Sequence, residues 1–287
     1  MKKILVATDF SERSDRAIRR ATLLARQFDA PLTIAHVVDD DQPKRAIVAK
    51  QQAAQELLDA YVHSLRDVDG LACETRIAFG DPFLGIIQAA REENADLTII
   101  GPHRRQILKD VFIGTTAERT IRASDRPILM ANGVPAGPYR HVLLAVDLSD
   151  SSGEAVRAVQ EHRFADAVDL SVIHIFDAPA LGFMLRTASA EDQIKDYLAD
   201  EEERAASELS IFLKKFDMES ARPILKHKAS TVAHTICSVA REISADLIVV
   251  GTHGLTGIKK TLLGSVAEEL LRISDRDVLA ISSALPS

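Results

Sequence analysis

The stretch Asp246-Leu-Ile-Val-Val-Gly-Thr-His-Gly254, followed after nine residues by Gly264-Ser265, joins an apolar run to a glycine-rich segment and a helical pattern. The run is rich in β-branched residues and ends at glycine, which is typical of a buried parallel strand. Ser265 is an N-cap candidate for the helix that follows. Glycines at such a junction let backbone N–H groups approach an anion, and the helix N-terminus adds partial positive charge. The stretch therefore predicts a phosphate site.

The composition indicates a globular protein of two domains. The chain has 287 residues, of which 46% are hydrophobic, and its 35 basic and 42 acidic side chains give a net charge of −7. This balance does not favour a nucleic acid as the main partner. The apolar runs are far shorter than a membrane span and no signal peptide is evident, so we expect a cytoplasmic protein with no membrane contact. Cys73 and Cys237 lack the spacing of a zinc site.

Strand and helix patterns alternate along the first half of the chain. Strands are expected at 2–8, 32–38, 72–78, 96–100 and 127–130, and helices at 12–28, 43–66, 82–93 and 116–123. Such alternation indicates βαβ units and a parallel sheet, because each right-handed crossover returns the chain to the same direction.

The second half repeats the first. The segment 141–149 matches 3–11 at an offset of 138, and 272–276 matches 122–126 at an offset of 150, so the second copy is twelve residues longer. We expect two related α/β domains, at 1–132 and 140–287, joined by a linker at 133–139. Each is predicted to be an open, Rossmann-like parallel sheet of five strands in the order 3-2-1-4-5. Pairing of the last strands, 127–130 and 277–281, across a pseudo-twofold axis would remove two exposed edges.

Ligands of open parallel sheets bind beyond the carboxyl ends of the strands, where the strand order reverses. This point is expected between the first and fourth strands, which end at Asp9 and Gly101 in the first half and at Asp147 and Gly251 in the second. A carboxylate there can accept hydrogen bonds from ribose hydroxyls, while backbone donors and Ser265 bind phosphates. The alternative for Asp147 is an N-cap of the next helix.

This constellation resembles the universal stress protein family in its tandem form, over nearly the whole chain. The family's motif, G-x-x-G followed after nine residues by G-S/T, is matched fully by Gly251-Thr-His-Gly254 and Gly264-Ser265. The resemblance implies ATP, or else ADP or AMP, with Mg²⁺ on the phosphates rather than at a metal site of the protein. It also implies that the backbone of Ile175 contacts adenine. The nucleotide-binding residues expected in the second half are Ala145, Asp147, Ile175, Gly251, His253, Gly254, Gly264, Ser265 and Val266. A vestigial loop without ligand is the alternative.

The first half departs from the motif. It has Arg104 where the second glycine is expected, and Pro102 removes a backbone donor. Either this site has lost its nucleotide, or Arg104 turns inward and recognises an anion. The residues of such an altered site would be Asp9, Val37, Gly101, Arg104, Gly114 and Thr115.

The extra residues of the second half include an apolar run, 181–185, expected in a loop, and an acidic run, 196–203, expected on a helix. The apolar run could form a lid, contact a partner, or pack on its own domain. Loop residues His103 and His253 could contact phosphate or simply lie exposed, whereas His36 and His174 are expected in the core.

Three functions are compatible with these residues and with what the resemblance implies. The first is an ATP-binding stress-response protein whose nucleotide biases conformation or the binding of an unidentified protein partner. The second is a slow ATP hydrolase or nucleotidyl transferase, for which no catalytic residue pair stands out. The third is a scaffold or small-molecule carrier that uses the altered first pocket. Further homodimerisation is compatible with all three.

Overall fold

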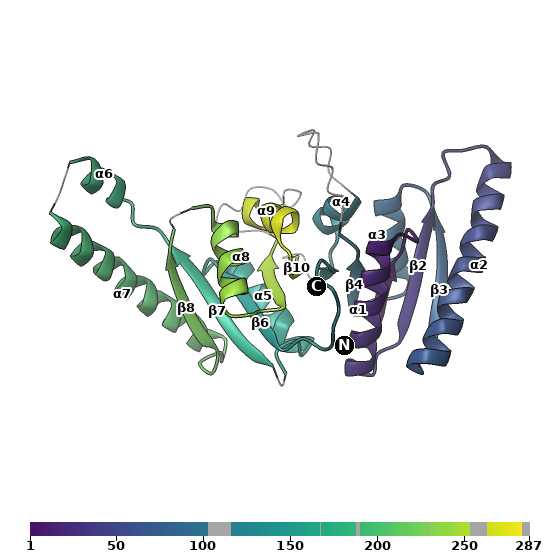
Figure 1. Cartoon of the computed structure of the whole chain (residues 1–287), viewed down its shortest axis with the longest axis horizontal. Coiled ribbons are helices and arrows are strands. Elements are labelled where there is room, and N and C mark those ends of the chain that lie inside the picture. The colour runs from purple at the N-terminus through teal and green to yellow at the C-terminus, as the bar shows by residue number, and fades with distance from the viewer. Residues whose placement is uncertain (103–115, 167, 188–189, 229, 253–262, 283–287) are drawn as a thin grey trace.

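The computed structural model describes residues 1–102, 116–166, 168–187, 190–228, 230–252 and 263–282 (Figure 1). The elements of the first half are β1 (Ile4–Ala7), α1 (Glu12–Phe28), β2 (Leu32–Val38), α2 (Lys44–Asp69), β3 (Cys73–Phe79), α3 (Pro82–Glu92), β4 (Leu97–Ile100), α4 (Thr116–Ala123) and β5 (Ile128–Met130). Those of the second half are β6 (His141–Val146), α5 (Asp150–Glu161), β7 (Asp169–Phe176), α6 (Leu181–Arg186), α7 (Glu191–Lys215), β8 (Arg222–His227), α8 (Val232–Glu242), β9 (Leu247–Gly251), α9 (Ser265–Ile273) and β10 (Asp277–Ile281).

The ten strands form one sheet in the order β3-β2-β1-β4-β5-β10-β9-β6-β7-β8. Within each half all pairs are parallel, and the predicted order 3-2-1-4-5 is confirmed. The predicted pairing of the last strands is also confirmed, since β5 and β10 lie antiparallel with Leu129 opposite Leu279. The two five-stranded sheets therefore join into one, with helices on both faces (Figure 1). None of the helices that the structure describes is long and apolar enough to cross a membrane.

The helices that follow the first strand of each half begin in the same way. The chain passes through a left-handed residue, Phe10 with φ of 59° or Leu148 with φ of 62°. Ser11 and Ser149 then cap α1 and α5, each accepting a hydrogen bond from the backbone N–H three residues later. The interpretation of Asp147 as the N-cap is therefore wrong, because Ser149 takes this place. The prediction of Ser265 as the N-cap of α9 is also wrong, because Gly264 is the N-cap and Ser265 is the first helical residue.

A buried polar cluster fastens the two halves together beside the β5–β10 pair. Asp277 on β10 accepts hydrogen bonds from Arg20 Nε at 2.8 Å, from the Tyr139 hydroxyl at 2.6 Å and from the Gly133 N–H at 2.8 Å. Arg20 also donates to the carbonyl of Gly137 at 2.8 Å and lies over the Tyr139 ring. Because Arg20 belongs to α1 and Asp277 to β10, this cluster links elements at opposite ends of the chain.

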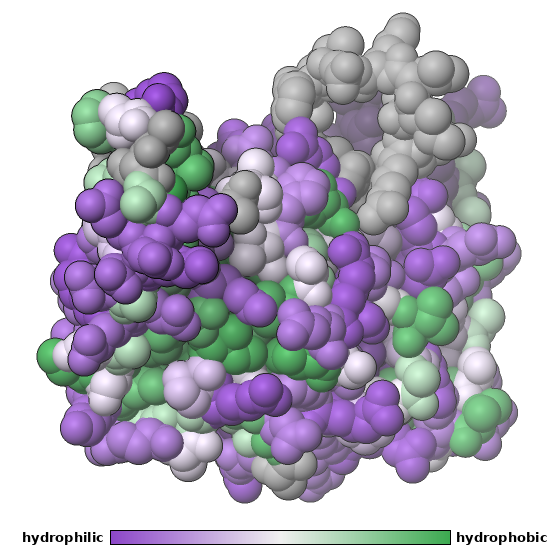
Figure 2. Space-filling model, turned by 60° about the vertical axis from the view of Figure 1, so that its left-hand side comes forward, coloured by the Kyte–Doolittle hydropathy of each residue, from purple (hydrophilic) through white to green (hydrophobic). Residues whose placement is uncertain are grey.

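The predicted loop at 181–185 is wrong, since these residues form the short helix α6. Leucine and methionine are good helix formers, and the Ala180 N–H is fixed by the Tyr197 hydroxyl of α7 at 3.1 Å. The helix lies beside the N-terminal end of α7 at the outer end of the molecule (Figure 1). The side chains of Phe183 and Leu185 are each 62% exposed, so these two do not pack into their own domain. Figure 2 shows hydrophobic side chains below this projecting end, bordered by hydrophilic ones.

Candidate functional site

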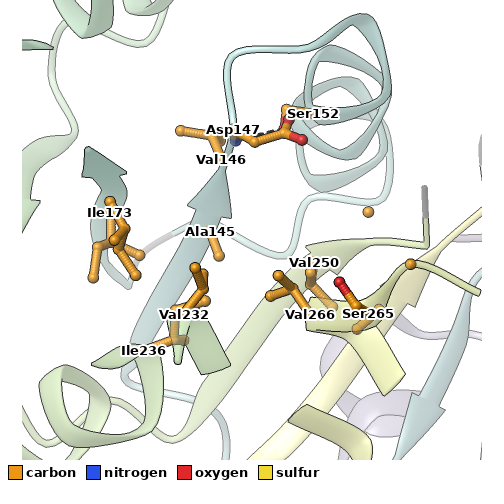
Figure 3. A pocket seen from close by; sticks show the side chains of 14 residues that line it. Ala145, Val146, Asp147, Ser152, Ile173, Val232, Ile236, Val250, Ser265 and Val266 are labelled. Carbon is orange, nitrogen blue, oxygen red and sulfur yellow. Dashed lines mark hydrogen bonds between the residues drawn. The ribbon is translucent and has the colours of Figure 1, made fainter. Parts of the chain in front are cut away.

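A cavity of about 250 Å³ lies at the carboxyl ends of the central strands of the second half, β6 and β9, and of their neighbour β7 (Figure 3). The N-terminal parts of α8 and α9 form its other walls. The lining residues are Ala145, Val146, Asp147, Ser152, Ile173, Ile175, Val232, Ile236, Val250, Gly251, Gly264, Ser265, Val266 and Ala267. This is the position that the reversal of strand order predicts.

One side of the cavity is apolar. Ile173 and Ile175 of β7 line this side. Val232 and Ile236 approach from α8, where their spacing of four residues places both on one face of the helix (Figure 3). Val250 extends this surface on β9. Such a wall suits a flat, weakly polar group, which it binds by contact area and not by charge.

Asp147 stands at the opposite, polar side (Figure 3). Its Oδ1 accepts hydrogen bonds from the backbone N–H of Ser149 at 3.1 Å, from the Ser149 hydroxyl at 2.5 Å and from the Ser152 hydroxyl at 2.6 Å. The Asp147 N–H in turn donates to Ser152 Oγ at 2.9 Å. The carboxylate is thus held in one orientation at the N-terminal end of α5.

The third side is the N-terminus of α9. The Gly264 N–H donates to the carbonyl of Thr252 at 2.6 Å, which brings the start of α9 close to the end of β9. Gly264 is the N-cap, and within the described residues no side chain caps the first N–H groups of α9. A helix N-terminus of this kind favours an anion.

The residues predicted for a nucleotide site in the second half come together here. Seven of them line the cavity: Ala145, Asp147, Ile175, Gly251, Gly264, Ser265 and Val266. The other two, His253 and Gly254, lie outside the described residues. The role of all nine in binding stays a prediction.

Sequence reasoning missed seven lining residues: Val146, Ser152, Ile173, Val232, Ile236, Val250 and Ala267. For Ser152 a signal was present, because Asp147-Leu-Ser149-Asp-Ser-Ser152 repeats Asp9-Phe-Ser11-Glu-Arg-Ser14 with both serines in place. For the residues of α8 none was present, because the face of a helix that turns toward a cavity depends on packing.

The equivalent region of the first half is built differently. A Cβ on Gly101 would lie 2.8 Å from the Arg13 carbonyl oxygen and 3.1 Å from Ser14 N, so the start of α1 closely approaches the end of β4. The side chain of Asp9 is 66% exposed and lies 3.9 Å from Arg13 Nη2. Burial acts to raise the pKa of Asp9, but Ser11, Ser14 and Arg13 outweigh it and lower this pKa.

Of the remaining residues predicted for a site in the first half, some are described by the structure and others are not. Val37 lies on β2, where a Cβ on Gly85 of α3 would lie 2.5 Å from its Cγ1, so strand and helix pack closely there. Arg104, Gly114, Thr115 and the neighbouring His103 lie outside the described residues. The two strand histidines are half-buried, and Nδ1 of His36 and of His174 lies 2.9 Å and 3.1 Å from the carbonyl oxygens of Thr8 and Val146.

Comparison with known proteins matches both halves to one family. The profile of the Universal stress protein family matches residues 1–132 and 138–282. A universal stress protein of Mycolicibacterium smegmatis is 25% identical, over 97% of this chain and 96% of its own. Universal stress protein A homolog 1 of Coxiella burnetii is 32% identical, over 50% of this chain and 96% of its own. The crystal structure of a universal stress protein from Archaeoglobus fulgidus superposes with a TM-score of 0.67 at 19% identity, over 98% of both chains.

Proposed function

The chain belongs to the universal stress protein family, and on this basis we propose that it binds an adenine nucleotide, ATP in the first place, in the cavity of its second half. Binding would regulate conformation or partner contacts in a stress response. The observation that carries the proposal is the arrangement of three surfaces around one cavity: an apolar wall, a fixed carboxylate and a helix N-terminus.

The base would lie against the apolar wall. Ile173, Ile175, Val232 and Ile236 offer aliphatic contact from β7 and α8. The backbone of Ile175 on β7 would contact the edge of the base, as the family resemblance implies. The cavity of about 250 Å³ is slightly below the usual range for ligand pockets of about 300–1,000 Å³, so it would hold base and ribose while the phosphates extend beyond it.

The ribose would lie at Asp147. A carboxylate only accepts hydrogen bonds, and the two ribose hydroxyls are donors at the spacing that one carboxylate can serve. Since Asp147 is already oriented by Ser149 and Ser152, little conformational freedom is lost when the sugar binds.

The phosphates would extend toward Gly251, Gly264 and Ser265. The N–H groups at the start of α9 and the Ser265 hydroxyl are donors that match phosphate oxygens. In the part of the chain that the structure describes, no group of three or more His, Cys, Asp or Glu side chains could hold a metal ion. Mg²⁺ would be carried on the nucleotide phosphates, as the family resemblance implies.

The experiment is mass spectrometry of the ligand that denaturation releases from the purified protein, followed by calorimetry of the stripped protein with ATP and Mg²⁺. We expect ATP to be released and rebound at one nucleotide per chain. ADP together with measurable phosphate release would favour the slow hydrolase instead. If no nucleotide is released and none rebinds, the proposal is wrong and the carrier function gains support.

A further inference from the structure

We propose that Ser152 is the positioning residue of Asp147, and that one neighbouring side chain, Val146 in the second half and Thr8 in the first, decides whether the aspartate of each half is fixed for a ribose. This inference rests on the proposed function. It assigns a role to two residues of the cavity lining, and it explains why the two halves differ at a point where their motifs agree.

In the second half Ser152 serves Asp147 twice. Its side chain is buried on the first turn of α5, its hydroxyl donates to Asp147 Oδ1 at 2.6 Å, and its oxygen accepts the Asp147 N–H at 2.9 Å. Figure 3 shows the Asp147 and Ser152 side chains facing each other, with Val146 preceding Asp147 at the end of β6. Together with the two bonds from Ser149, three donors converge on one carboxylate oxygen. An oxygen bound in this way fixes the direction of the other oxygen as well.

In the first half the equivalent serine is engaged elsewhere. The Thr8 hydroxyl lies 3.0 Å from Ser14 Oγ, and the Ser14 hydroxyl donates to the carbonyl of Ser11 at 2.8 Å. Asp9 Oδ1 accepts hydrogen bonds from the N–H and the hydroxyl of Ser11, at 3.1 and 2.5 Å. Ser14 also lowers the pKa of Asp9, but less than Ser11 does. The Asp9 side chain is 66% exposed.

The backbone does not cause this difference. Phe10 and Leu148 have nearly the same φ, and Ser11 and Ser149 are equivalent N-caps. What differs is the residue before the aspartate. A serine hydroxyl has one proton to donate. In the first half Thr8 donates to the Ser14 oxygen, and the Ser14 proton is directed to a carbonyl. Val146 has no hydroxyl, so in the second half the proton of Ser152 is directed to the carboxylate, where the bond is charge-assisted and stronger.

The test compares ATP with 2′,3′-dideoxy-ATP, which lacks both ribose hydroxyls, by calorimetry on the full chain. The wild type should prefer ATP. Val146→Thr and Ser152→Ala should each reduce this preference about 3- to 10-fold while changing affinity for the dideoxy analogue less than about twofold. A merely structural effect would weaken both ligands alike.

Matched variants separate the hydroxyl from other effects. Val146→Ala changes the volume of the lining without adding a hydroxyl, so it should keep the preference for ATP. Ser151→Ala removes the neighbouring serine, whose hydroxyl has no hydrogen-bond partner among the described residues, and should behave as the wild type. Thermal unfolding of Val146→Thr should stay near that of the wild type, because Thr8 shows that a threonine here finds partners in the serine and in the N–H two residues later.

The outcomes are distinct. If Val146→Thr and Ser152→Ala keep the wild-type preference for ATP, the positioning role is wrong. If the wild type binds both nucleotides equally, Asp147 does not contact the ribose, and the inference is wrong while nucleotide binding stands. If the wild type binds neither, the proposed function itself is wrong.

Discussion

Replacing Arg20 with methionine should destabilise the whole chain, because it leaves a buried carboxylate without its cation. The Arg20 and Asp277 side chains are 5% and 1% exposed, and their Nε–Oδ2 distance is 2.8 Å. Methionine keeps an unbranched apolar side chain in the same space. What is lost is the charge, the hydrogen bond to the Gly137 carbonyl and the contact over the Tyr139 ring.

The expected loss is large for a single substitution. Removal of one partner from a buried ion pair destabilises proteins by about 3–5 kcal/mol, because the other charge stays buried. Asp277 retains two neutral donors, the Tyr139 hydroxyl and the Gly133 N–H. We therefore expect a loss near the lower end of this range, about 3 kcal/mol in the free energy of unfolding.

The loss should depend on pH in a defined direction. Burial raises the pKa of Asp277, whereas Arg20, Tyr139 and Gly133 act to lower it. A carboxyl with a raised pKa in the folded state binds its proton more tightly there than in the unfolded chain. The free energy of unfolding therefore falls as the pH rises from the unfolded-state pKa to the folded-state pKa of Asp277. Without Arg20 the pKa of Asp277 rises further. The difference between wild type and Arg20→Met should thus be greatest at neutral pH and shrink as the pH falls toward about 4, near the unfolded-state pKa.

Urea unfolding followed by far-ultraviolet circular dichroism measures these differences, since the chain contains no tryptophan. Arg19→Met is the matched control: Arg19 lies 2.7 Å from Asp69 with its side chain 50% exposed, so the loss there should stay below about 1 kcal/mol. The double variant Arg20→Met/Asp277→Asn should be more stable than Arg20→Met alone. A loss for Arg20→Met that matches the control, or that does not vary with pH, would refute the reasoning.

Three further changes test the site and the fold. Asp147→Ala should weaken ATP binding by about 1–3 kcal/mol in calorimetry, and unchanged affinity would remove Asp147 from the ribose site. Gly254→Arg copies the first half into the second and should abolish ATP binding without lowering the melting temperature; full binding would contradict the motif assignment. Gly101→Ala should destabilise by about 1–3 kcal/mol in urea, because the new Cβ would meet the backbone of Arg13. Gly137→Ala, with open space around its Cβ, should not.

The order of the strands could be predicted from the sequence because it follows from local patterns and handedness. Apolar runs such as 97–100 and 247–250 are buried on both faces, which identifies them as central parallel strands. Right-handed crossovers then leave few arrangements. Finer features depend on packing and backbone conformation, which the sequence pattern does not predict. The chain at Leu181 becomes helical beside α7, and the cap of α5 is Ser149 because Leu148 turns the backbone through a left-handed conformation.

The residues of the candidate site also fall into those that the sequence could predict and those that it could not. Asp147 and Gly251 could be predicted, since they end neighbouring parallel strands and the carboxyl ends of such strands share one edge of the sheet. Val232 and Ile236 could not, because their helix has other apolar residues and only its packing against the sheet and α9 selects the face that lines the cavity. Ser152 is an intermediate case. The internal repeat shows a serine at this position in both halves, but only the hydrogen bond to Asp147 in the structure indicates its role.

The serine hydroxyl near the aspartate is hydrogen-bonded in both halves. In the first half the Thr8 hydroxyl donates to Ser14 Oγ and accepts the Phe10 N–H, and the Ser14 hydroxyl donates to the Ser11 carbonyl, so both hydroxyls have partners. In the second half Val146 needs no partner, and Ser152 is satisfied by Asp147. In both halves the first strand is followed by a helix with a serine N-cap. Since both arrangements leave the serine hydroxyl with hydrogen-bond partners, we expect the orientation of Asp147 to act mainly through what the carboxylate binds. The affinity for ribose hydroxyls, and not the melting temperature, is therefore the property in which Val146 and Thr8 should differ.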